Sequence, residues 1–276
     1  MKVSGKEVAE AICKKLEKEI KSKNLKPSLA IILAGDNPAS RIYVKNKIKK
    51  ALEIGIDAKL FKFSQNQFNQ CLQTIKKLNA DKKTHGIIVQ YPVFDGWNFD
   101  NLILNIDPRK DVDGFSPESP FMGATALAVW EMLTAFAKKE GFSKTENFLK
   151  NKKIVVLGKG KTAGRPTGDL LKKKGINFSL IDSKTENPNE IIKNADVVIS
   201  ATGVKHMING KNIRKGSFVI GVGMGKDEGK IYGDIDEEEI AKIAKLYCPT
   251  IGGIGPLTIA CLLRNVVESC KHGTFR

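Results

Sequence analysis

Lys47 is the residue whose type and surroundings in the sequence best indicate a catalytic role. Lys47 lies four positions after Tyr43 in a helical pattern, so both side chains share one face of that helix. Gln90 lies at the end of an apolar strand pattern, and Asp113 lies in the loop region that follows. Open α/β sheets gather their sites at such strand ends. We therefore interpret Lys47, Gln90, Tyr43 and Asp113 as the candidate catalytic residues.

Lys47 can act as a base near neutral pH only if its pKa is lowered. Burial has this effect on a lysine, because it disfavours the charged form. Val44, Ile48 and Leu52 form an apolar stripe that we expect to press the helix onto a sheet, with Lys47 at the edge of that contact. The remaining lysines of this helix are interpreted as solvated: Lys45, Lys49 and Lys50.

A glycine-containing turn at 158–166 is a second candidate site. It reads G-x-G-x-x-x-G, one residue longer than the usual dinucleotide fingerprint, and it follows a strand pattern. Glycines let the backbone approach a pyrophosphate, whose charge is met by amides of the next helix. A plain tight turn is the alternative. The turn residues assigned to cofactor binding are Gly158, Lys159, Gly160, Lys161, Thr162, Gly164, Arg165 and Pro166.

The residues after the next strand bear on which dinucleotide binds. Asp182 favours NAD, because an acidic residue here holds the ribose diol and repels a 2′-phosphate. Lys159, Ser183 and Lys184 favour NADP, because cations and hydroxyls bind that phosphate. We expect NADP, with NAD as the alternative if Asp182 faces the ribose. Thr202, at the end of a later strand, is a further cofactor-binding candidate.

Strand and helix patterns alternate along the chain, which predicts parallel sheets. The fold expected is α/β, with an N-terminal parallel-sheet domain, a C-terminal Rossmann-type nucleotide-binding domain and a cleft between them.

A polar stretch at 141–153 precedes the point where the strand-helix pattern starts again. The catalytic domain is expected over 1–122, completed by a C-terminal helix at 256–276, and the nucleotide domain over 123–255. The elements expected are helices near 5–23, 38–55, 65–81, 125–139 and 168–175 and strands near 28–35, 57–63, 85–93, 153–158, 177–182, 196–203 and 217–223.

Composition excludes several classes of protein. The 276 residues are 28% charged and 41% hydrophobic, which is ordinary for a globular chain of two domains. No apolar run is long enough for a membrane span, and the start of the chain does not read as an export signal. The five scattered cysteines lack a C-x-x-C pair, so we expect no disulfide framework and no metal site, and a cytoplasmic location.

The formal net charge of +16 permits a nucleic-acid partner without requiring one. The lysines are interleaved with glutamates along helical patterns, and no nucleic-acid-binding motif accompanies them. We expect small anionic substrates and no nucleic acid.

Five segments together resemble the bifunctional methylenetetrahydrofolate dehydrogenase/cyclohydrolase family. They occur in the family's order across nearly the whole chain, so the combination is far more specific than any one of them. The matching segments are 35–47, 86–92, 107–115, 158–166 and 252–260.

The resemblance implies oxidation of 5,10-methylenetetrahydrofolate with NADP, then hydrolysis of the methenyl product to 10-formyltetrahydrofolate, within one-carbon metabolism and purine biosynthesis. It implies that Lys47 serves the proton transfers, that Gln90 adjusts its basicity and that Tyr43 orients the folate. Asp113 would bind the pterin N–H groups, since a carboxylate only accepts hydrogen bonds. The substrate-binding set it implies is Tyr43, Lys47, Gln90, Asp113, Gly252, Gly253 and Pro256, with Gly255 beside them. It also implies a homodimer formed through the nucleotide domain.

The sequence departs from the family pattern at three places. Gly123–Ala126 replaces a Pro-Cys-Thr-Pro run after a short loop, Gly221 stands where Asp is common, and Ile251 replaces a proline. These departures bear on cofactor geometry and substrate fit. Two alternatives remain open: a dehydrogenase without cyclohydrolase activity, and a basic nucleic-acid-binding protein without catalysis.

Overall fold

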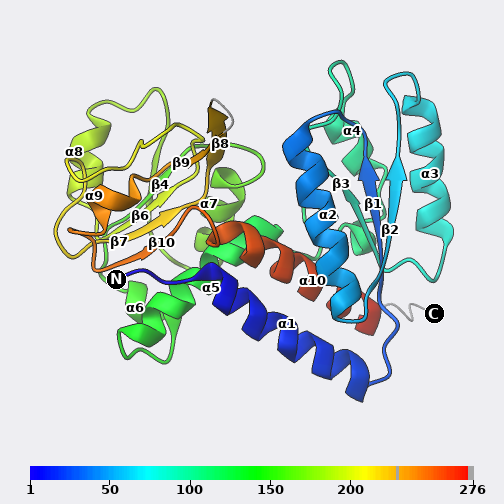
Figure 1. Ribbon diagram of the computed structural model, residues 1–276, viewed down its shortest axis with the longest axis horizontal. Helices are drawn as coiled ribbons and strands as arrows, with labels where there is room; N and C mark the ends of the chain where they lie inside the picture. The colour runs from blue at the N-terminus through cyan, green and yellow to red at the C-terminus, as the bar shows by residue number, and fades with distance from the viewer. Residues whose placement is uncertain (228–229, 273–276) are drawn as a thin grey trace. The chain divides into compact units, whose positions relative to one another are not determined.

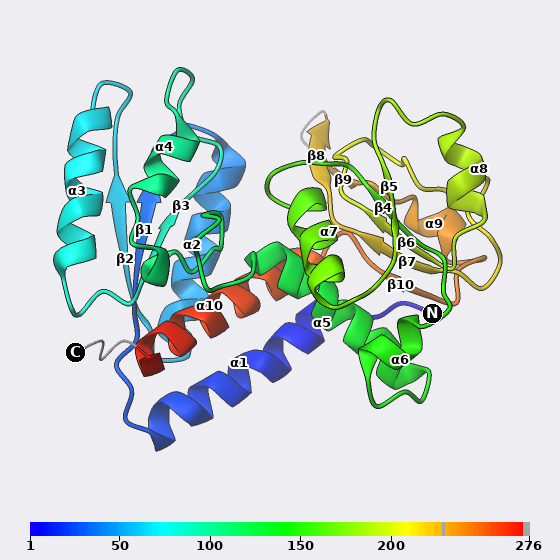
Figure 2. The same ribbon diagram turned by 180° about the vertical axis from the view of Figure 1, so that it is seen from behind.

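The computed structural model describes residues 1–227 and 230–272, which divide into two compact units. One unit consists of Met1–Glu10 and Thr125–Thr258, and the other of Ala11–Ala124 with the chain from Ile259 onward. Each has a parallel sheet with helices packed on it (Figures 1 and 2). The predicted α/β class with two parallel-sheet domains is confirmed. The boundary at residues 122 and 123 and the cleft stay predictions, and residues 273–276 of the expected last helix lie outside the described residues.

The unit that carries Lys47 has a three-stranded parallel sheet in the order β2-β1-β3. These strands span Ser28–Leu33 (β1), Asp57–Lys62 (β2) and Gly86–Val89 (β3). Alternate residues such as Ala30, Ile32 and Ile87 form a core with α3 and α4, while α2 lies on the opposite face (Figures 1 and 2). The helices so far are α1 (Gly5–Ser22), α2 (Pro38–Glu53), α3 (Phe68–Ala80), α4 (Phe99–Leu104) and the 3-10 turn η1 (Pro108–Lys110).

The other unit has a five-stranded parallel sheet in the order β10-β7-β6-β4-β5. The chain leaves β4 towards β5 and then returns to β6 on the other side of β4, which creates the topological switch point of a Rossmann-type sheet. Its strands span Ile154–Leu157 (β4), Ser179–Ile181 (β5), Val197–Ser200 (β6), Phe218–Gly221 (β7) and Leu246–Cys248 (β10). Its helices span Ala124–Lys139 (α5), Thr145–Leu149 (α6), Gly164–Lys173 (α7), Pro188–Lys193 (α8) and Glu237–Ile240 (α9), and α10 covers Ile254–His272.

Three features differ from the sequence-based expectations. The polar stretch at 141–153 contains α6, whose Phe148 is buried and packs edge-on against Phe218 at 4.9 Å. Strands β8 (Met224–Asp227) and β9 (Lys230–Gly233) form an antiparallel pair that was not predicted from the sequence. Helix α7 begins at Gly164, four residues before the expected start at 168, so the last glycine of the motif is the first helical residue.

Candidate active site

Helix α2 carries Lys47 and begins and ends as expected. The side chain of Asn37 accepts the backbone N–H groups of Ala39 and Ser40, at 2.9 and 3.3 Å, and Pro38 occupies the first helical position. Gly55, just beyond the end of the helix, has a φ of +89°. These caps fix where the helix starts, and therefore the height of Lys47 above the sheet.

Helix α2 is rotated about its axis relative to the prediction, and this rotation places Lys47 on the buried face. The prediction that Val44, Ile48 and Leu52 form the buried stripe was wrong, because Leu52 is 57% exposed. The buried face instead consists of Ser40, Val44, Lys47 and Ala51. Small residues at both ends of this face allow the helix to lie close to the sheet, which turns Lys47 inward.

Lys47 is 3% exposed and has two neighbours from the predicted set. Its Nζ donates a hydrogen bond to Gln90 Oε1 at 3.1 Å and lies 4.8 Å from the centre of the Tyr43 ring. Gln90 follows β3, and its Nε2 donates to the carbonyl of Tyr91 at 2.8 Å, which leaves the amide oxygen facing the amine. The structure thus brings Tyr43, Lys47 and Gln90 together.

Burial dominates the protonation of this group. It lowers the pKa of Lys47, and the negative charge of Asp113 opposes the shift. Burial likewise raises the pKa of Asp113, while the charge of Lys47 lowers it. Both shifts favour uncharged forms, so the site can hold a lysine that accepts a proton.

The loop that carries Asp113 is held in place by hydrogen bonds. The buried carboxylate of Asp111 accepts the N–H groups of Gly114 and Ser116 at 3.1 and 2.7 Å, and burial raises the pKa of Asp111 to about 6. Asn265 of α10 donates from Nδ2 to the carbonyls of Val112 and Met122, at 2.9 and 3.2 Å. The loop is therefore fixed from within and from the last helix. Neither Asp111 nor Asn265 was predicted from the sequence as a functional residue.

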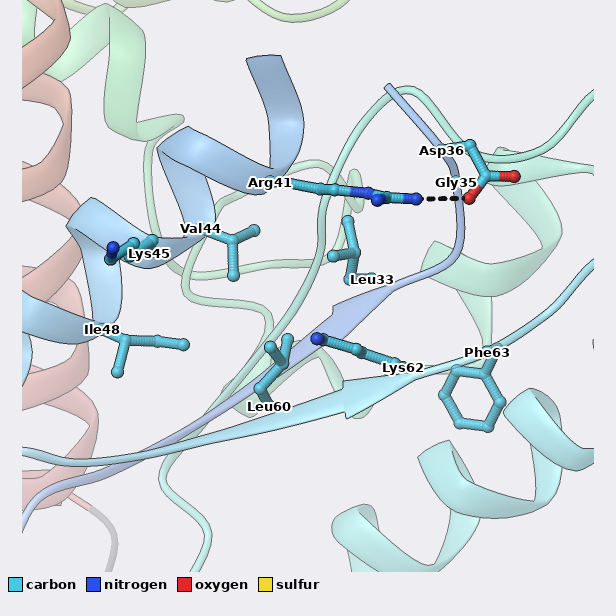
Figure 3. A pocket seen from close by; sticks show the side chains of 10 residues that line it. All are labelled: Leu33, Gly35, Asp36, Arg41, Val44, Lys45, Ile48, Leu60, Lys62 and Phe63. Atoms are coloured by element: carbon cyan, nitrogen blue, oxygen red, sulfur yellow. Dashed lines mark hydrogen bonds and ion pairs between the residues drawn. The ribbon is translucent and has the colours of Figure 1, made fainter. Parts of the chain in front are cut away.

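A cavity of about 540 Å³ lies on the flank of α2 nearer to β2 (Figure 3). Arg41 reaches across its mouth to Asp36, with 2.7 Å between Nη2 and Oδ1, and Leu60 and Lys62 of β2 line it from below. The lining residues among those described do not include Tyr43, Lys47, Gln90 or Asp113. This cavity is therefore separate from the candidate catalytic group.

The glycine turn after β4 is closely packed at two of its glycines and open at the third. Gly158 has a φ of +95°, and a Cβ there would lie 2.5 Å from the carbonyl oxygen of Ala201. A Cβ on Gly164 would lie 2.0 Å from the carbonyl oxygen of Gly158, whereas one on Gly160 would meet no atom within 4 Å. Two glycines thus permit close packing, and the third leaves the backbone open to a ligand. The exposed members of the predicted set are Lys159, Gly160, Lys161, Thr162, Arg165, Ser183 and Lys184, and Pro166 lies in the first turn of α7.

Asp182 is engaged by its own neighbours. Its Oδ2 lies 2.6 Å from Lys159 Nζ, and its Oδ1 accepts the backbone N–H of Lys184 at 3.0 Å. The cation of Lys159 holds the pKa of Asp182 at about 2. The charge that would repel a 2′-phosphate is therefore partly compensated by a lysine from the glycine turn.

Thr202 lies at the C-terminal end of β6, where a buried carboxylate holds it. Asp234 accepts the Thr202 backbone N–H at 3.0 Å and its hydroxyl at 3.2 Å. Asp234 is completely buried and was not predicted from the sequence as a functional residue. A local signal was absent, because Asp234 and Thr202 are distant in sequence.

The segment around Gly252 follows β10 and leads into α10. Gly252 has a φ of +76°, and a Cβ on Gly253 would lie 1.8 Å from the carbonyl oxygen of Pro249. Both glycines are therefore required by the local backbone, and Gly255 and Pro256 belong to the first turn of α10. Their binding of folate stays a prediction.

The three departures from the family pattern lie in different local surroundings. A Cβ on Gly221 would lie 3.1 Å from the side chain of Ile235. Ile251 is 71% exposed. Gly123 packs against the loop that carries Asp113, because a Cβ added to Gly114 would lie 2.8 Å from the backbone nitrogen of Gly123.

Comparison with known families matches both units. The catalytic-domain model of tetrahydrofolate dehydrogenase/cyclohydrolase matches residues 3–113, and the NAD(P)-binding-domain model matches residues 124–274. The bifunctional protein FolD of Caldanaerobacter subterraneus is 34% identical over 281 residues, covering 99% of this chain and 97% of that protein. That of Lactococcus lactis is 36% identical over 271 residues, covering 95% of each.

Solved structures agree with these matches. The bifunctional FolD enzyme of Campylobacter jejuni is 36% identical, with a TM-score of 0.90 and 99% of each chain covered. The Trypanosoma brucei dehydrogenase-cyclohydrolase, solved with NADP and an inhibitor, is 27% identical with a TM-score of 0.90, covering 100% of this chain and 99% of that one. The predicted family, enzyme class and NADP cofactor are confirmed, and the two alternative functions are not favoured. This chain belongs to the tetrahydrofolate dehydrogenase/cyclohydrolase family.

Proposed function

We propose that this chain oxidises 5,10-methylenetetrahydrofolate to the methenyl form and then hydrolyses that product to 10-formyltetrahydrofolate. The observation that carries the proposal is the buried amine of Lys47, hydrogen-bonded to Gln90 at 3.1 Å. Relatives at 34% and 36% identity that are named bifunctional support both activities.

A neutral Lys47 suits the oxidation step. Loss of a hydride from the methylene bridge leaves a positive charge on the folate, and a protonated amine beside it would repel that charge. Burial favours the uncharged amine by lowering its pKa, and the negative charge of Asp113 opposes this shift. When bound, NADP supplies the hydride acceptor, and the residues that would hold it are Gly158, Gly160 and Lys159 of the glycine turn.

The same amine suits the hydrolysis step. Water adds to the methenyl carbon and must lose a proton, which neutral Lys47 accepts as a general base. Gln90 Oε1 accepts a hydrogen bond from the amine and so fixes the direction of its lone pair. Tyr43 would orient the folate ring, and Asp113 would accept the pterin N–H groups.

The direct test mixes the protein with methylenetetrahydrofolate and NADP and follows the absorbance of reduced nicotinamide. Growth of that absorbance without lasting methenyltetrahydrofolate supports both activities. Accumulation of methenyltetrahydrofolate would instead leave a dehydrogenase alone, and no reduction with NADP or NAD would refute the oxidation.

We further propose a cytoplasmic homodimer. Met224 and Ile231 on the β8–β9 pair are 51% and 59% exposed, which supports an association surface on the nucleotide unit. None of the five cysteines, all of which lie in the described part of the chain, forms a disulfide, which is consistent with a reducing compartment. The described residues include no helix that is both long and apolar enough to cross a membrane. Light scattering on the purified protein tests the dimer.

A further inference from the structure

The carboxylate of Asp234 joins two loops of the nucleotide unit. Asp234 directly follows β9, and none of it is exposed. Its Oδ1 accepts the N–H of Gly203 at 2.7 Å and the Thr202 hydroxyl at 3.2 Å. Its Oδ2 accepts the N–H groups of Thr202 and Gly223, both at 3.0 Å. Four donors thus converge on one buried side chain.

These two loops leave neighbouring strands at the ligand-binding edge of the sheet. Thr202 and Gly203 follow β6, Gly223 follows β7, and the two strands pair in parallel up to Ser200 and Gly221. The loop after β6 also touches the glycine turn, because a Cβ on Gly158 would lie 2.5 Å from the carbonyl oxygen of Ala201. In a Rossmann-type sheet the dinucleotide lies across these strand ends.

The site is built to receive a carboxylate. A Cβ on Gly223 would lie 2.5 Å from both oxygens of Asp234, so only glycine leaves room. The backbone N–H of Asp234 in turn donates to the carbonyl of Gly223 at 3.1 Å. A buried carboxylate costs free energy unless its hydrogen bonds are satisfied, and these donors satisfy them.

We propose that Asp234 is a positioning residue for the nicotinamide half of NADP. It fixes the loops after β6 and β7, and its buried negative charge favours the oxidised nicotinamide ring, which is cationic, over the neutral reduced ring. This inference rests on the cofactor site proposed for the glycine turn and not on the role of Lys47.

The test compares Asp234→Asn with the wild-type protein. NADPH binding is followed by its fluorescence, and NADP⁺ binding by competition. We expect the dissociation constant of NADP⁺ to rise by about tenfold or more and that of NADPH to rise clearly less, because only the oxidised ring loses a charge interaction. Hydrogen exchange at the amides of Thr202, Gly203 and Gly223 should become faster.

Asp196→Asn is the matched control. Asp196 precedes β6 at the opposite edge of the sheet, where it accepts the N–H of Lys153 at 2.8 Å and pairs with Arg214 at 3.2 Å. This variant should bind both forms of the cofactor as the wild type does. If Asp196→Asn changed the ratio of the NADP⁺ and NADPH dissociation constants as much as Asp234→Asn does, the proposal would be overturned.

Other outcomes are equally decisive. Equal weakening of both forms by Asp234→Asn would overturn the electrostatic role, and unchanged binding would overturn the positioning role. If Asp234→Asn does not fold, Thr202→Val removes the hydroxyl that donates to Asp234 at 3.2 Å and accepts the N–H of Val204 at 3.2 Å. Because the charge of Asp234 stays in place, this variant should weaken the binding of both forms alike, and unchanged binding refutes the positioning role. A wild-type protein that binds neither form would refute the cofactor site itself, which is a separate failure.

Discussion

Replacing Lys47 with Met tests the central amine, because Met keeps the length of the side chain and removes its base. Loss of general base catalysis costs about 10²- to 10⁴-fold in rate, and we expect the hydrolysis rate to fall by that much. The free energy of unfolding of this variant should instead rise. The lost hydrogen bond to Gln90 costs about 1 kcal/mol, whereas Met at this position avoids the free energy of burying a group that is charged in the unfolded chain.

The pH dependence of this stability gain has a definite sign. Burial lowers the pKa of Lys47 in the folded state, so the unfolded state binds more protons between the folded and the ordinary pKa. The free energy of unfolding of the wild type therefore rises with pH across that window, and Lys47→Met lacks this rise. We expect the advantage of the variant in thermal denaturation to shrink as the pH rises towards about 10.

Lys49→Met is the control for this experiment. Lys49 is exposed on the same helix, so its replacement should leave both rates and the melting temperature near wild type. The reasoning fails if Lys47→Met retains hydrolysis. It also fails if that variant loses activity only because it melts at a lower temperature, or if its advantage in stability grows with pH.

Three further substitutions test other parts of the site. Asp113→Asn should raise the KM for the folate by about 10- to 100-fold with a smaller effect on kcat, and steady-state kinetics would refute this if kcat alone fell. Asp182→Ser frees Lys159 and should raise the kcat/KM ratio of NADP over NAD about tenfold; an unchanged ratio means that Asp182 does not face the ribose. Gly164→Ala places a Cβ 2.0 Å from the carbonyl oxygen of Gly158 and should weaken NADP binding and cost about 1–3 kcal/mol of stability, to be measured by titration and denaturation.

Local signals in the sequence predicted much of the fold. Asn37 followed by Pro38 has the chemistry of a helix start, and Gly158 has a backbone conformation that glycine adopts readily. Apolar runs such as 154–157 are long enough to predict buried strands. These features depend on neighbours in the chain, so periodicity and turn residues are sufficient to find them.

Features that depend on distant contacts could not be predicted. The rotation of α2 is set by packing against the sheet, which overrode the apparent stripe that ended at Leu52. Asp234 acts on Thr202, which lies 32 positions earlier. Asn265 reaches Val112 over 153 positions. Such pairings become visible only when the chain has folded.

The reach of α10 has a consequence for synthesis on the ribosome. Asn265 supports the carbonyls at both ends of the Asp113 loop, and the Ser269 hydroxyl donates to the carbonyls of His85 and Arg109 at 2.6 and 3.2 Å. The strands around Lys47 are translated first, and Asn265 follows Val112 by 153 positions, so this support emerges from the exit tunnel much later. The loop that carries Asp113 therefore acquires its full set of hydrogen bonds only after the chain has been translated through Ser269.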